Sequence, residues 1–178
     1  MFRIIRFCIS FVTVLSPLLA ARLVNFFWFR TQRYPESRRE QRLLEDAKWQ
    51  KIECQKQIIQ LYSWGEKNQQ TVLLVHGWNG RGAQLGSFVP QLVEQGFRVI
   101  AFDAPGHGRS SGNSTNLLEI SKVIQHLSQD YGPIKAAISH SFGGLCLMHA
   151  ISAGSKIDKV VCIASAFNVE RLVTIFAK

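Results

Sequence analysis

The sequence predicts an α/β fold in which a mostly parallel sheet carries helices on both faces. Near-continuous apolar, β-rich runs such as TVLLVHG (71–77) and FRVIAFD (97–103) are typical of strands buried on both faces. Helix-forming segments separate these runs and the connections are short, which favours parallel strands joined by crossover helices. The chain of 178 residues is long enough for one domain with a sizeable core.

Helices and strands are expected to alternate along the chain from Pro35 onward. Pro35 and the acid that follows it indicate the first turn of a helix, which we expect to run to about Gln50. Residues 52–64 are expected to form one strand or a short hairpin. The remaining expected elements are a strand at 71–77, a helix at 83–95, a strand at 97–103, a helix at 117–131, a strand at 134–139, a helix at 142–154 and a strand at 159–166. The chain thus divides into an apolar, basic N-terminal helix (1–34), a linker helix (35–51) and an α/β core (52–178).

Residues 1–34 are apolar and basic, with five arginines and no acid. Three interpretations remain open. The segment could be a cleaved signal peptide with small residues near Ala20. It could be a helix that spans the membrane, kinked at Pro17 and with its flanking arginines reaching the interface. It could also be a helix with one narrow polar stripe, which lies in the membrane interface or packs on the domain. We favour membrane association, with the domain on the cytoplasmic side because further arginines follow the segment.

The composition also excludes several classes of function. The net charge of +9 is concentrated near the N-terminus, where it suits an anionic membrane surface, and no nucleic-acid-binding motif is present. The four cysteines are scattered without a CxxC pair, which argues against a disulfide framework and a structural metal. We therefore expect no cofactor, no bound metal and no nucleic-acid partner.

Glycine, histidine and serine gather where the expected strands end. In open parallel sheets, function concentrates at the carboxyl ends of the strands. The segments there are HGWNGRG (76–82), DAPGHGRSSG (103–112), SHSFGG (139–144) and SAFN (165–168).

Ser141 is the candidate nucleophile. It lies two residues from Ser139 and two from Gly143, as expected for a serine on a sharp strand-to-helix turn whose neighbours must be small. Acyl transfer at a serine also needs donors for the developing oxyanion, and the backbone amides of Trp78 and Phe142 are the candidates. A small-residue turn without catalytic function is the alternative for SHSFGG. The HGWNGRG segment lacks the G-x-x-x-x-G-K-[ST] pattern of a phosphate-binding loop.

Three motifs together resemble the α/β-hydrolase superfamily over roughly residues 52–178. They are a strand ending in His-Gly, a strand ending in D-x-P-G-H-G-x-S and an S-x-S-x-G-G turn, in that order. The HGW-x-G-R loop and the basic, apolar N-terminal helix resemble those of a group of small, mostly uncharacterised bacterial α/β hydrolases. The turn departs from the usual G-x-S-x-G in having Ser139 at its first small position.

The resemblance implies a serine hydrolase that acts on esters, thioesters or related small acyl compounds. A serine at 141 argues against enzymes of the haloalkane or epoxide type, whose nucleophile is an aspartate. The resemblance also implies that five residues belong to the loops beside the substrate, with Asp103 and His107 shaping the loop rather than catalysing. These residues are His76, Gly77, Asp103, His107 and Ser110.

The acid and histidine of the triad are expected beyond Lys178. In this superfamily the order is serine, then an acid after a later strand, then a histidine near the C-terminus. None of the five histidines (His76, His107, His126, His140 and His149) is expected within hydrogen-bond reach of Ser141 as a general base. We therefore expect a C-terminally truncated member of the superfamily that lacks its last strands, and the 178-residue chain alone is expected to be inactive. The alternative is an inactive hydrolase that serves as a binding or vestigial protein.

Overall fold

The computed structural model describes residues 12–67 and 69–165. The chain divides into two units, Met1–Arg30 and Thr31–Lys178, and each is described by itself. The larger unit holds every candidate residue named above.

A mixed sheet of six strands forms the centre of the larger unit within the described residues. The strands are β1 (Lys48–Cys54), β2 (Gln57–Trp64), β3 (Thr71–Val75), β4 (Arg98–Phe102), β5 (Ile134–His140) and β6 (Ile157–Ile163). Their order is β1-β2-β4-β3-β5-β6. Strands β4, β3, β5 and β6 run parallel, whereas β2 is antiparallel to both of its neighbours. The predicted α/β fold with a mostly parallel sheet is confirmed.

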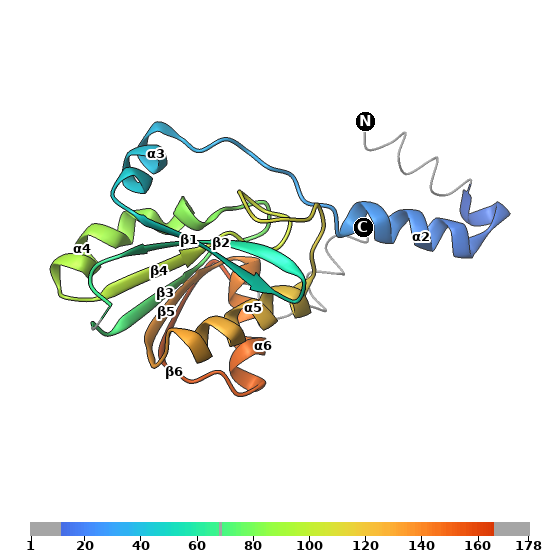
Figure 1. The fold of residues 1–178 in the computed structure, drawn as a ribbon. Helices are drawn as coiled ribbons and strands as arrows, with labels where there is room; N and C mark the ends of the chain where they lie inside the picture. The colour runs from blue at the N-terminus through green and yellow to red at the C-terminus, as the bar shows by residue number, and fades with distance from the viewer. Residues whose placement is uncertain (1–11, 68, 166–178) are drawn as a thin grey trace. The chain divides into compact units, whose positions relative to one another are not determined.

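Helices cover both faces of the sheet, as Figure 1 shows. The side chains of β3 alternate between the two faces because successive residues of a strand point in opposite directions. Leu73 belongs to the core beneath α5 (Leu117–Asp130) and α6 (Phe142–Ser152). Leu74 belongs to the core beneath α3 (Arg38–Glu45), the 3-10 helix η1 (Gly82–Phe88) and α4 (Val89–Glu94). Both leucines are at most 1% exposed, which explains why the strand is apolar throughout.

The expected helix from Pro35 to about Gln50 is wrong in its extent. Helix α3 ends at Glu45, and β1 begins at Lys48. Strand β1 pairs along its whole length with β2 through a two-residue turn, Gln55-Lys56, in which both residues have positive φ. This is the turn geometry that matches the twist of a hairpin. Pairing with β2 therefore decides the conformation of residues 48–54, and the hairpin expected at 52–64 begins four residues earlier.

The expected helix at 83–95 is divided into η1 and α4. Pro90 lies in the first turn of α4, where its missing N–H costs no hydrogen bond. A Cβ at Gly86 would overlap the side chain of Leu43, so the 3-10 segment approaches α3 closely. The other expected elements agree with the structure to within two or three residues at their ends.

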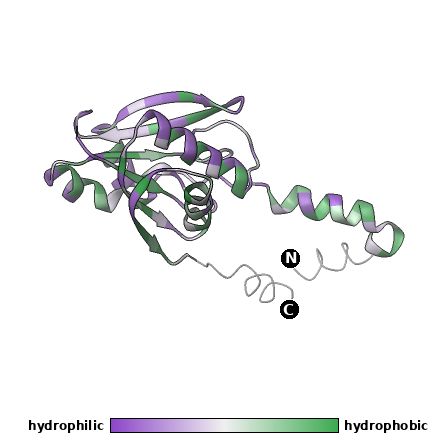
Figure 2. Ribbon diagram, turned by 90° about the horizontal axis from the view of Figure 1, so that it is seen from below, coloured by the Kyte–Doolittle hydropathy of each residue, from purple (hydrophilic) through white to green (hydrophobic). Residues whose placement is uncertain are grey.

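The smaller unit contains a helix break at Ser16. Residues 12–15 are helical, and α2 (Pro17–Trp28) begins directly after Ser16, whose hydroxyl accepts a hydrogen bond from Leu19 N at 3.3 Å. Pro17 therefore starts a helix rather than kinking one. Figure 2 shows that α2 is mostly apolar. Among the described residues, no helix is both long and apolar enough to cross a membrane. The first part of the expected polar stripe, including Arg3 and Arg6, lies outside the described residues.

Candidate active site

Ser141 occupies a strained turn between β5 and α6. Its backbone has φ +50° and ψ −123°, a conformation that is costly for any residue with a Cβ. The Ser141 amide donates to Ile163 O of β6 at 2.9 Å, and its carbonyl accepts from Gly144 N at 3.0 Å. A Cβ at Gly143 would overlap the backbone carbonyl of His76, so only glycine fits there. The turn therefore holds the serine where strand β5 ends.

Ser139 takes the place of the usual glycine without disturbing the turn. Its side chain is fully buried, and its hydroxyl lies 3.3 Å from both Val161 O and Cys162 Sγ on β6. A hydroxyl group adds little volume, and the carbonyl gives it a hydrogen-bond acceptor. This departure from the G-x-S-x-G pattern is thus accommodated.

The loop that follows β3 lies directly against this turn. We call residues 76–82 the β3 loop. A Cβ at Gly77 would approach Ser141 Cβ to 3.1 Å, and the Trp78 and Phe142 rings pack edge to face with centroids 5.4 Å apart. Within the described ranges, neither the Trp78 N–H nor the Phe142 N–H donates a hydrogen bond to another residue. Two free donors therefore belong to the residues that border the serine.

Two buried, neutral histidines join the β3 loop to the loop that follows β4, residues 103–116, which we call the β4 loop. His76 Nε2 accepts from Ala104 N at 2.9 Å, and its Nδ1–H donates to Gly77 O at 2.7 Å. His107 Nε2 accepts from Asn79 N at 3.0 Å, and its Nδ1–H donates to Pro105 O at 2.9 Å. Burial lowers the pKa of His76 to about 3 and also lowers the pKa of His107. Both rings are neutral at pH 7, and all four ring nitrogens have partners.

Asp103 organises the start of the β4 loop. Its carboxylate accepts from Gly82 N at 2.7 Å, from Arg109 N at 2.8 Å and from the Tyr62 hydroxyl at 2.8 Å. Burial raises the pKa of Asp103, while the three donors act in the opposite direction. Burial, followed by the neighbouring Asp103 carboxylate, raises the pKa of the Tyr62 phenol. The carboxylate is thus committed to fixing loop backbone.

Ser110 closes the same loop onto the sheet. Its hydroxyl donates to Asp103 O at 2.6 Å and accepts from Gln60 N of β2 at 2.9 Å. The side chain is 3% exposed, so both of its hydrogen-bonding roles are used inside the protein. Ser110 therefore lies behind the loop rather than in contact with solvent.

The structure brings together Ser141, Gly77, Trp78 and Phe142. It places four further predicted residues in a hydrogen-bond network behind them: His76, Asp103, His107 and Ser110.

No histidine ring among residues 12–67 and 69–165 is hydrogen-bonded to Ser141 Oγ. His140 Nδ1 is buried without a partner in that part of the chain and lies 3.0 Å from where a Cβ on Gly77 would be. His126 and His149 lie on α5 and α6. No group of three or more metal-ligating side chains occurs in the described residues.

Sequence reasoning missed the part played by residues 31–40, because it assigned the arginines near the N-terminus to a membrane surface. In the structure Arg33 donates to Ser110 O and to Gly112 O, both at 2.7 Å. The acceptors are backbone carbonyls, which every residue has, so no pattern of side chains in the sequence predicts these hydrogen bonds.

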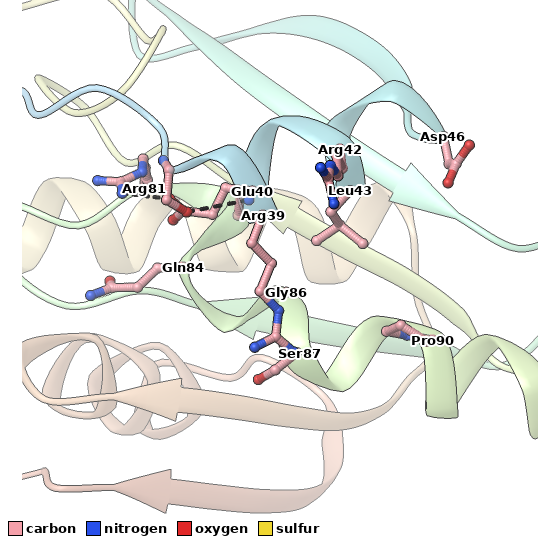
Figure 3. Close-up of a pocket in the computed structure, with 12 residues that line it drawn as sticks. Arg39, Glu40, Arg42, Leu43, Asp46, Arg81, Gln84, Gly86, Ser87 and Pro90 are labelled. Carbon is pink, nitrogen blue, oxygen red and sulfur yellow. Dashed lines mark hydrogen bonds and ion pairs between the residues drawn. The ribbon is translucent and has the colours of Figure 1, made fainter.

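Arg81 of the β3 loop also forms a salt bridge with Glu40 of α3 at 2.6 Å (Figure 3). Both residues line a pocket of about 600 Å³, and Ser141 is not among the residues that line it.

The strain at Ser141 can be tested by stability alone. We expect Ser141→Gly to be more stable than Ser141→Ala by about 1 kcal/mol, because glycine relieves the strained backbone and alanine does not. Chemical denaturation of both variants measures this difference. Ser128 on α5 is a matched control, where the order should reverse because glycine weakens a helix by roughly 0.5–1 kcal/mol relative to alanine. Equal stability of the two Ser141 variants would contradict the strain.

The buried state of His76 predicts a dependence of stability on pH. The unfolded chain gains a proton at this ring below about pH 6.5, whereas the folded protein resists it down to about pH 3. Stability contributed by neutral His76 is therefore complete above pH 6.5 and is lost as the pH falls toward 3. The free energy of unfolding, measured by chemical denaturation at several pH values between 7 and 4, should fall less steeply with decreasing pH for His76→Gln than for the native protein. A His76 ring that titrates near pH 6.5 by NMR would disprove this.

Comparisons with known proteins agree with this geometry. The sequence model of one family, described as serine aminopeptidase, S33, matches residues 66–178. A pimeloyl-[acyl-carrier protein] methyl ester esterase of Pectobacterium carotovorum is 34% identical over 98 residues, which cover 53% of this chain and 36% of the relative. Putative methylesterase 15 of Arabidopsis thaliana, a chloroplastic protein, is 33% identical over 101 residues, covering 53% of this chain and 22% of the relative.

Solved structures show the same fold. The thioesterase domain from the curacin biosynthetic pathway superimposes with a TM-score of 0.61 at 27% identity, covering 74% of this chain and 53% of that one. The chain thus spans about a third or less of the curated relatives it matches and about half of this structural neighbour. The family match extends over more than half of the chain and includes the β3 loop, the β4 loop and the Ser141 turn. The chain therefore belongs to the serine aminopeptidase S33 family of the α/β-hydrolase superfamily.

Proposed function

We propose that this chain carries the nucleophile and the oxyanion hole of a serine hydrolase that cleaves an ester, a thioester or a related acyl compound. The observation that supports this best is the strained turn that presents Ser141 beside two N–H groups without acceptors in the described residues. Membership of a family of serine hydrolases supports the same class of chemistry.

In the proposed reaction, Ser141 Oγ attacks the acyl carbon of the substrate. The hydroxyl proton passes to a general base, and the carbonyl oxygen becomes an oxyanion that accepts hydrogen bonds from Trp78 N and Phe142 N. Phe142 is the first residue of α6, so the positive end of that helix also favours the negative charge. The base then returns the proton to the departing alcohol or thiol, and water hydrolyses the acyl-serine by the same steps.

The proposed general base is a histidine that follows the acid in chain order, as in other members of the superfamily. Within the described residues, the rings of His76 and His107 already have partners on both nitrogens, and their pKa values are lowered by burial. They are better suited to holding the loops than to accepting a proton from Ser141.

The proposed substrate is a small acyl ester or thioester. Two relatives are described as a methyl ester esterase and a putative methylesterase, and a structural neighbour is described as a thioesterase domain. These reactions share an acyl carbon and differ in the leaving group, so they require the same nucleophile and oxyanion donors.

A second candidate function is a binding or vestigial protein that no longer catalyses. One observation favours it: among the histidines that the structure describes, none is hydrogen-bonded to Ser141 Oγ. Such a protein would keep the loops and the turn but would not react at the serine.

A fluorophosphonate probe distinguishes the two functions. We expect the protein, expressed from its complete reading frame, to gain one phosphonyl group on Ser141, because the probe reacts with activated serines and its oxygen occupies the oxyanion position. Intact-protein and peptide mass spectrometry identify the modified residue. Ser141→Ala should abolish labelling, and Ser128→Ala on α5 should retain it. A folded protein that is not labelled would rule out the hydrolase and favour the binding protein.

We also propose that residues 12–30 adsorb to an anionic membrane surface, such as the cytoplasmic leaflet. Large apolar side chains are exposed here, including Phe27 at 66% and Trp28 at 63%. The first 34 residues carry arginines and no acid, which adds electrostatic attraction to acidic lipids. An exposed patch of this kind beside positive charge is typical of interfacial helices.

Vesicle co-sedimentation tests this proposal. We expect binding to vesicles that contain phosphatidylserine, and weaker binding to vesicles of phosphatidylcholine alone, because the arginines contribute only when the surface is acidic. Phe27→Glu should reduce binding to the acidic vesicles at least about tenfold, since it removes an apolar contact and adds a repelled charge. Leu118→Glu on α5, another exposed apolar position, is the control and should bind normally. Equal binding by both variants would refute the surface.

A further inference from the structure

We infer that residues 31–40, which we call the strap, position the two loops that flank the Ser141 turn, with Gln32 and Arg33 as the positioning residues. The strap precedes the sheet in sequence and belongs to the same unit as both loops. Its effect on catalysis rests on the proposed function, whereas its effect on the loops does not.

The strap holds the β4 loop by four hydrogen bonds to backbone carbonyls. Thr31 and Arg33 each donate two of them. The bonds are Thr31 N to Asn113 O at 3.0 Å, Thr31 Oγ1 to Gly106 O at 2.7 Å, and Arg33 Nη2 to Ser110 O and to Gly112 O, both at 2.7 Å. Because the guanidinium is charged, its two bonds are stronger than ordinary amide bonds. A salt bridge from Glu36 to Arg109 at 3.0 Å adds a fifth link to this loop.

The strap also holds the β3 loop at two points. Gln32 N donates to Asn79 Oδ1 at 2.8 Å, and Glu40 pairs with Arg81, as Figure 3 shows. Only 19% of the Arg81 side chain and 14% of the Glu40 side chain are exposed, so solvent screens this pair less than an open surface pair.

Asn79 connects the strap to the proposed oxyanion donor. It follows Trp78 directly and has φ +55°, a left-handed conformation that asparagine tolerates better than most residues. Its amide is bonded to His107 Nε2 and its side chain to Gln32 N. Asn79 is therefore held from the β4 loop and from the strap at once, and this fixes the peptide next to the Trp78 N–H. A displacement of about 1 Å in a catalytic group can cost about 10²-fold in rate.

Amide hydrogen exchange tests the structural part of this inference in the complete protein. We expect Arg33→Gln to raise exchange at the amides of Ser110 and Ser111 at least about tenfold, because the β4 loop loses two charge-assisted bonds. Exchange at the Asn79 amide should rise as well, because this amide is bonded to His107 of the same loop. Amides in the middle of α6 should be unchanged. Arg38→Gln removes the same charge from α3, where the Arg38 side chain has no hydrogen bond or salt bridge to a described residue, and this variant should exchange like the native protein. Thr31→Val is a milder second variant that deletes only the bond to Gly106 O. Native exchange in both strap variants would overturn the inference.

Fluorophosphonate kinetics tests the positioning part. We expect Arg33→Gln to lower the maximal rate of Ser141 labelling about tenfold while the half-saturating probe concentration stays the same, because the donors move but the probe site remains. Faster exchange with a native labelling rate would overturn the positioning role and leave the strap as a stabilising segment only. If even the native protein is not labelled, the proposed hydrolase fails, and the exchange comparison alone decides whether the strap holds the loops.

Discussion

The positive φ of Ser141 determines how closely helix α6 and the β3 loop approach each other. A serine held at φ +50° reverses the chain between β5 and α6 within a single residue. The reversal brings the first turn of α6 against the backbone of His76, so Gly143 cannot carry a side chain. It also brings the serine close enough to Gly77 that the β3 loop must be free of side-chain bulk there. The strain is tolerated because β5 is paired on both sides, by β3 and by β6, so the strand cannot shift to relieve it.

A second group of residues gives this turn rigid neighbours. The β3 and β4 loops have little regular structure of their own, and their backbone groups are held by side chains instead. His76, His107 and Asp103 each bind backbone N–H groups of these loops, and each is buried. A neutral histidine ring accepts one hydrogen bond and donates another, whereas a protonated ring can only donate. Burial keeps both rings neutral, and each ring can therefore hydrogen-bond to two backbone groups at once. The residues that look most catalytic in the sequence thus have their hydrogen-bonding capacity committed to the loops.

The fold could be predicted from the sequence because its signals are local. Strand β3 is apolar at every position, as burial on both faces demands, and α5 carries its apolar residues on one side. The Ser141 turn could also be predicted, since small residues at fixed spacing around a serine have a steric cause. The residue at which α3 ends could not be predicted from the sequence, because residues 48–54 form a strand only through their pairing with β2. The break at Ser16 was missed for a similar reason: Pro17 can kink a helix or start one, and capping by the Ser16 hydroxyl selects the second.

Long-range contacts explain the larger omission. Arg33 looks like one of several basic residues that follow an apolar segment, but it binds carbonyls 77 and 79 positions later in the chain. Backbone carbonyls are present at every residue, so such partners leave no trace in the composition or spacing of side chains. The same holds for Gln32, whose backbone N–H, not its side chain, reaches Asn79.

A crystal structure of the phosphonylated protein would show both the nucleophile and the oxyanion donors, and it therefore tests whether Ser141 acts beside an oxyanion hole made by Trp78 and Phe142. The protein should be prepared from its complete reading frame and treated with an alkyl fluorophosphonate before crystallisation. We expect a phosphorus–oxygen bond to Ser141 Oγ, with the free phosphonyl oxygen about 3 Å from both Trp78 N and Phe142 N. An adduct on another serine, or a phosphonyl oxygen that points away from both amides, would contradict it.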